Sequence, residues 1–207
     1  MYARVTRVKF DPARTDVVVE QLKSQMLPLF EQQRGYLGTI SIANRETGEG
    51  ATTTFWDTLE NLKASEPEVF AARDKFAAEQ ATEILSFHRC EVAVAERKAD
   101  PKAGAHLRVV TLRGAGVSKL EALVKRFREE VAPVALAQPG GRSATLMIDR
   151  ENEIAFGISA YDTASDRDAA GAALNPKRDV VVRELGLEAE TEHAETTYAD
   201  LKAPVQA

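Results

Sequence analysis

The sequence predicts an α+β fold built from two copies of one unit, each with the order β-α-β-β-α-β. Two observations predict this fold. The chain resembles itself when it is shifted by 105 residues, and both copies alternate between strand-like and helix-like segments in the same order. A short polar linker between the copies favours two units that pack against each other rather than two tethered, independent domains.

The internal repeat is clearest between Pro28 and Thr58. These 31 residues align with residues 133–163 without a gap, and seven of them are identical. About two identities are expected by chance, at roughly 6% per position. The identical pairs are Pro28/Pro133, Gln33/Gln138, Gly35/Gly140, Arg45/Arg150, Glu46/Glu151, Asp57/Asp162 and Thr58/Thr163. We therefore interpret the chain as a tandem duplication.

Each copy has an amphipathic helix after its first strand. Its apolar residues recur with a spacing of about 3.6 residues, which places them on one helix face. In the first copy they are Val18, Val19, Leu22, Met26 and Leu29, and in the second Leu123, Val124, Phe127, Val131 and Val134. A glycine that can adopt a left-handed cap follows each helix, Gly35 in the first copy and Gly140 in the second.

Four strands and a second helix complete each copy. The expected strands span 3–10, 36–44, 50–57 and 87–95 in the first copy, and 106–113, 141–149, 153–162 and 191–199 in the second. The second helices are predicted to begin at Ser65-Glu66-Pro67 and at Asn175-Pro176. The fourth strands align best with an offset of 104.

Asp57-Thr58 and Asp162-Thr163 are interpreted as helix caps in preference to carboxylates at a pocket rim.

The predicted boundaries are 1–97 for the first repeat, 98–104 for the linker, 105–200 for the second repeat and 201–207 for a tail. Neither face of the strand at Ile154–Tyr161 carries a charge, and the same holds for the strand at Leu37–Ala43 in the first copy. A sheet with helices on one side therefore needs a cover on the other. We expect the two sheets to cover each other as an intramolecular pseudo-dimer.

Composition narrows the functional classes. A net charge of −5 and a pI near 5.4 argue against a nucleic-acid partner. No apolar run approaches the ~18 residues of a membrane span, so we expect no membrane partner and a cytoplasmic location. Cys90 is the single cysteine, three scattered histidines make no metal-ligand set, and phosphate- or dinucleotide-binding motifs are absent. No metal or cofactor is expected.

The aromatic-Asp pair that closes the third strand, Phe55-Trp56-Asp57-Thr58, together with the strand order, resembles the antibiotic biosynthesis monooxygenase family. This family belongs to the dimeric α/β-barrel (ferredoxin-like) superfamily, and the resemblance covers both halves. It implies a barrel built within one chain, with a ligand pocket between the sheet and the helices of each unit. Trp56 also resembles the haem-degrading branch. That branch uses a helix histidine and a first-strand asparagine, which this chain lacks, so haem degradation is not expected.

Three residues are candidates for a substrate-binding site. Trp56, the single tryptophan, could stack on a flat ligand or simply fill the core. Tyr161, its counterpart in the second copy, could orient a substrate through its hydroxyl or reach water. His88 could act as a base, or form structural hydrogen bonds at the start of its strand.

Two functions remain open. The first is an α/β-barrel protein that is non-catalytic or binds a small molecule, and the alternative is a cofactor-independent monooxygenase-like enzyme acting on an aromatic small molecule. An apolar pocket of roughly a few hundred Å³ that touches Trp56 or Tyr161 and also a histidine would favour the enzyme, and solid halves would favour the non-catalytic protein. Because Phe55-Trp56 and Ala160-Tyr161 differ, we expect a working pocket in at most one half. A small aromatic ligand and a homodimer are the partners left open.

Overall fold

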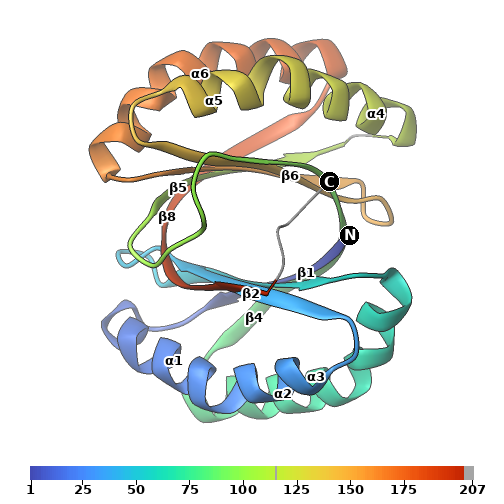
Figure 1. The fold of residues 1–207 in the computed structure, drawn as a ribbon, viewed down its shortest axis with the longest axis vertical. Helices are drawn as coiled ribbons and strands as arrows, with labels where there is room; N and C mark the ends of the chain where they lie inside the picture. The colour runs from blue at the N-terminus through green and yellow to red at the C-terminus, as the bar shows by residue number, and fades with distance from the viewer. Residues whose placement is uncertain (115, 203–207) are drawn as a thin grey trace.

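The computed structural model describes residues 1–114 and 116–202, which form a closed barrel between two layers of helices (Figure 1). The strands are β1 (Tyr2–Lys9), β2 (Tyr36–Ala43), β3 (Glu49–Trp56), β4 (Glu83–Arg97), β5 (His106–Arg113), β6 (Gly141–Asp149), β7 (Ile154–Tyr161) and β8 (Glu188–Leu201). Their order around the barrel is β1-β3-β2-β8-β5-β7-β6-β4. Of the predicted tail, residues 203–207 lie outside the described residues.

The two halves share one topology, which confirms the α+β pseudo-dimer. In each half the first strand lies between the third and the fourth, and all of these neighbours are antiparallel. The equivalent pairs are Tyr2↔Trp56 and His106↔Tyr161, and Tyr2↔Glu91 and His106↔Glu195. The third strands are thus offset by 105 residues and the fourth strands by 104, as the sequence predicts.

The halves are joined edge to edge as well as face to face. β4 of the first half pairs with β6 of the second, and β8 of the second half pairs with β2 of the first. Both long strands carry a bulge near the seam. Beyond it, Val94 packs in the helix-side core of the second half and Tyr198 against that of the first. Hydrogen bonds between the two sheets therefore close the barrel, which leaves no free sheet edge.

The barrel interior is a shared apolar core. Ala3, Val5 and Phe55 of the first half cluster there with Met147 and Phe156 of the second. These residues alternate along their strands with residues that face the helices. The uncharged strand faces noted in the sequence do cover each other.

The first helix of each half contains one π-helical turn. The segments are η1 (Pro12–Arg14), α1 (Thr15–Gln21), η2 (Leu22–Met26) and α2 (Leu27–Gln32), and then α4 (Val117–Arg126), η3 (Phe127–Val131) and α5 (Ala132–Ala137). Pro28 and Pro133 lie just after the π turns, and neither can donate an N–H to the helix. In the first half, the Leu27 N–H donates to the Leu22 carbonyl five residues earlier, which is the hydrogen bond of a π turn.

The second helices, α3 (Leu59–Gln80) and α6 (Ala164–Leu185), begin earlier than the sequence predicts. Thr58 caps α3 by accepting the Asn61 N–H at 3.1 Å, which confirms the capping interpretation. Pro67 lies inside α3 rather than at its start, and Leu62 in the turns that precede it is fully buried. Pro176 lies inside α6 in the same way. Within 1–114 and 116–202, no helix has the length and apolar character to cross a bilayer.

Candidate functional site

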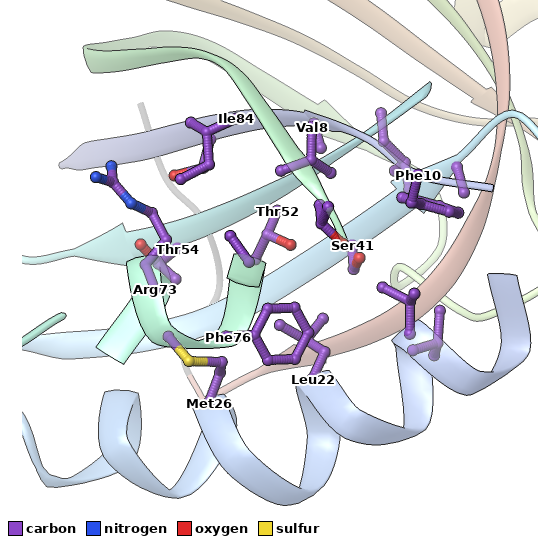
Figure 2. A pocket seen from close by; sticks show the side chains of 18 of the residues that line it. Val8, Phe10, Leu22, Met26, Ser41, Thr52, Thr54, Arg73, Phe76 and Ile84 are labelled. Carbon is purple, nitrogen blue, oxygen red and sulfur yellow. The ribbon is translucent and has the colours of Figure 1, made fainter. Parts of the chain in front are cut away.

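An apolar cavity of about 70 Å³ lies between the sheet and the helices of the first half (Figure 2). The sheet side includes Val8 on β1 and Thr52 on β3, both on the face that looks toward the helices. The helix side includes Leu22 and Met26 from the π turn and Phe76 from α3. The π turn therefore shapes this wall, as such turns often do at functional sites.

Phenylalanine side chains make this cavity aromatic. Phe10, Phe30, Phe70 and Phe76 all line it. At the positions equivalent to Phe30, Phe70 and Phe76, the second half has Ala135, Asn175 and Val181. Four phenylalanines thus line the first cavity, whereas Phe127 is the one phenylalanine among the described residues that line the cavity of the second half.

The second half has a smaller cavity of about 50 Å³ at the equivalent place. Phe127 occupies the position of Leu22, and Gly157 that of Thr52. A Cβ atom on Gly157 would lie only 3.3 Å from Phe127 Cε2. The phenylalanine ring therefore lies directly on the sheet and takes space that stays open in the first half.

Arg4 forms the polar end of the first cavity. Arg4 is only 2% exposed, and its Nη1 donates a hydrogen bond to Ser65 Oγ at 3.0 Å. Its guanidinium carbon lies 4.9 Å from the centre of the Trp56 ring. Within the described part of the chain, Nη2 has no hydrogen-bond partner. Burial lowers the pKa of Arg4 to about 10, so the group is still a cation at neutral pH.

The charges near Arg4 leave it without a carboxylate of its own. Glu66 attracts it, but both Glu66 oxygens are held by Arg89 at 2.7 and 2.8 Å. Arg73, which also lines the cavity, pairs with Asp74 at 2.7 Å. The end of the cavity is therefore electropositive.

Arg108, the counterpart of Arg4, has a different acceptor, since Ala170 stands at the position of Ser65. It is also buried and also lines the cavity of its own half. Its Nη2, however, donates a hydrogen bond of 2.7 Å to Asn175 Oδ1. Asn175 occupies the position of Phe70, so the second half supplies an acceptor that the first half lacks.

Trp56 and Tyr161 occupy equivalent, fully buried positions on the helix side of the two sheets. The Trp56 Nε1–H donates to Thr54 Oγ1 at 3.0 Å, and its ring meets Tyr36 edge to face at 5.9 Å. Burial raises the pKa of Tyr161, and Ser159 partly offsets this shift. Neither ring lines the cavity of its half. Trp56 instead contacts Arg4, which lines the cavity.

His88 points into the barrel, away from both helix-side cavities. Its Nδ1 lies 2.9 Å from Asp149 Oδ2, and its Nε2 lies 3.0 Å from Ser86 Oγ. Since a carboxylate can only accept, Nδ1 donates to Asp149. The histidine bridges β4 of the first half and the β6–β7 hairpin of the second. The structure therefore does not bring His88 together with Trp56 or Tyr161, whose roles as site residues stay predictions.

Sequence reasoning missed Arg4, Arg73 and the phenylalanine walls. One signal was present: Arg4 and Arg108 share an offset of 104, and each interrupts the apolar residues on the helix side of its strand. Among the described residues, no group of three or more His, Cys, Asp or Glu side chains could hold a metal ion.

Two curated relatives align with nearly the whole chain. An uncharacterised protein of Mycobacterium tuberculosis is 28% identical over 210 residues, which cover 99% of this chain and 86% of that protein. A second uncharacterised protein of the same organism is 23% identical over 205 residues, covering 99% and 91%. No family model matches the chain.

Solved structures share the fold at low sequence identity. A candidate monooxygenase of Fusobacterium nucleatum has a TM-score of 0.69 at 11% identity, covering 100% of this chain and 96% of that one. An anthrone oxidase-like protein has a TM-score of 0.66 at 14% identity with the same coverage. A ferredoxin-fold protein of Listeria monocytogenes, described as related to antibiotic biosynthesis monooxygenases, has a TM-score of 0.55 at 8% identity, covering 95% of each chain. The chain has the dimeric α/β-barrel fold of these proteins.

Proposed function

We propose that the protein binds a small, largely apolar aromatic molecule in the cavity of the first half. The observation that carries this proposal is a cavity walled by phenylalanines and ended by a single buried cation. Ligand sites are commonly concave and apolar, with few polar groups that fix orientation. The second half, with Phe127 lying on Gly157, serves as the supporting repeat.

Binding without catalysis fits the cavity better than the monooxygenase-like alternative. Abstraction of a proton from an aromatic substrate needs a base within hydrogen-bond reach. The ionisable side chains that line the cavity are Arg4 and Arg73, and both are cations. His88, the predicted base, faces the barrel with both ring nitrogens engaged. The likeness to an anthrone oxidase-like protein supports the alternative only through the fold.

Leu22→Phe is expected to weaken binding of 4-propylbenzamide, a neutral aromatic probe, by about tenfold or more. The new ring faces Thr52 instead of a glycine, so it must project into the cavity. Isothermal calorimetry on the full chain measures the change. Adding Thr52→Gly reproduces the Phe127–Gly157 arrangement and is expected to restore part of the affinity.

Phe127→Leu is the matched control, because it makes the same exchange in reverse in the second half. We expect it to leave binding of the probe unchanged. Failure of the wild-type protein to bind the probe, or a larger loss in Phe127→Leu than in Leu22→Phe, would count against the first-half site. Oxygen consumption with a dihydroxyanthracene that depends on His88 would favour the enzyme instead.

The homodimer and the cytoplasmic location stay predictions, as do the repeat boundaries at 97, 104 and 200. Analytical ultracentrifugation of the full chain tests the homodimer. The binding proposal needs only one chain, because every lining residue of the cavity belongs to it.

A further inference from the structure

We propose that the ligand of the first-half cavity carries an anionic group, a carboxylate, which pairs with the free Nη2 of Arg4. This inference rests on the proposed function and specifies the class of molecule bound. The ligand would be an aromatic acid, with its ring among the phenylalanines and its carboxylate at the arginine.

The state of Arg4 is the first argument. A buried charge without a partner is strongly unfavourable, and proteins normally pair such charges or supply full hydrogen bonding. Arg4 is 2% exposed, donates one hydrogen bond to a neutral hydroxyl and lies over the Trp56 ring. Contact with the ring recovers part of the lost hydration. Glu66 is the carboxylate that attracts Arg4, but both of its oxygens are held by Arg89.

The comparison of the halves is the second argument. Arg108 lies at the same place in the second sheet, and there Asn175 accepts its Nη2–H. In the first half the same helix position is Phe70, whose ring centre lies 5.9 Å from the Arg4 guanidinium carbon. The second half therefore supplies an acceptor for Nη2, whereas among the described residues of the half with the aromatic cavity Nη2 has none.

The neighbours of Arg4 are the third argument. Thr54 lines the cavity, and its Oγ1 accepts the Trp56 N–H, which leaves the hydroxyl proton able to donate to a ligand. Arg73 adds a second positive charge at the cavity wall. Glu66 attracts Arg4, but its two carboxylate oxygens accept hydrogen bonds from Arg89. A carboxylate at this end would meet the Arg4 guanidinium and one hydroxyl donor, with the Arg73–Asp74 ion pair nearby.

The test compares 4-propylbenzoate with 4-propylbenzamide, which match in shape and differ in charge, by calorimetry on the full chain at neutral pH. A hydrogen bond to a charged group contributes about 1.5–3 kcal/mol, so we expect the benzoate to bind roughly tenfold to a hundredfold tighter. Arg4→Met should remove this preference, so that the two probes bind with similar affinities. Arg108→Met, the matched control, should retain the preference.

Phe70→Asn gives a second test that keeps the charge of Arg4. It places in the first half the acceptor that Asn175 provides in the second, so the preference for the benzoate should fall by about fivefold or more. This variant decides the matter if Arg4→Met does not fold. Equal affinity of wild type for the two probes overturns the anionic ligand while the cavity site stands. Binding of neither probe overturns both proposals.

Discussion

Asp149→Ala should lower the free energy of unfolding by about 3–5 kcal/mol, because it leaves several hydrogen-bond donors around a buried site without an acceptor, at about 1–3 kcal/mol each. The Asp149 side chain is almost fully buried, at 1% exposure. It accepts hydrogen bonds from the N–H groups of Glu151 and Asn152, from Asn152 Nδ2 and from His88 Nδ1. One side chain thus holds the β6–β7 hairpin and ties it to β4 of the other half.

Asp149→Asn distinguishes the role of the turn hydrogen bonds from the role of the carboxylate group. Asn44, the equivalent residue in the first half, accepts the N–H groups of Glu46 and Thr47 through Oδ1. An asparagine therefore suits this turn, and we expect a smaller cost of about 1–2 kcal/mol. Urea unfolding followed by circular dichroism measures both variants, with Asn44→Ala as the control for a turn that lacks a histidine. Equal losses in Asp149→Ala and Asn44→Ala would show that the contact with His88 adds nothing.

The fold could be predicted because it follows from local sequence patterns and because these patterns recur in both halves. The apolar stripe that begins at Val18 is repeated at Leu123, and the polar hairpin at Arg45 is repeated at Arg150. Such periodicity depends only on neighbours along the chain. The starts of α3 and α6 were wrong for a tertiary reason. Pro67 and Pro176 resemble first-turn prolines, yet burial of residues such as Leu62 keeps the preceding turns helical.

The site could be predicted only in part. The location of the cavity, between sheet and helices, followed from the family resemblance. Its polar end did not, because the isolation of Arg4 depends on Ser65, Phe70 and Glu66, which lie more than 60 residues away along the chain. Trp56 drew attention as a rare aromatic residue. Its place behind Arg4 is set by strand register, which a single sequence does not give.

Trp56→Ala should be among the most destabilising changes in the first half, with a loss of about 3–5 kcal/mol in the free energy of unfolding. The ring is fully buried, meets Tyr36 edge to face and supports the guanidinium of Arg4. Truncation leaves a large void and also removes the π face under a buried cation. Denaturant unfolding of the full chain measures the loss.

Trp56→Phe distinguishes a supporting role from direct contact with the ligand. A phenylalanine keeps most of the packing and the π face, and loses the N–H bond to Thr54 Oγ1. We expect it to cost about 1–2 kcal/mol of stability and to change calorimetric affinity for 4-propylbenzoate by less than about threefold, since Trp56 does not line the cavity. A larger loss of affinity at nearly native stability would place the indole against the ligand. Arg4 would then share its position at the cavity end with Trp56, and the ring would be part of the site rather than its support.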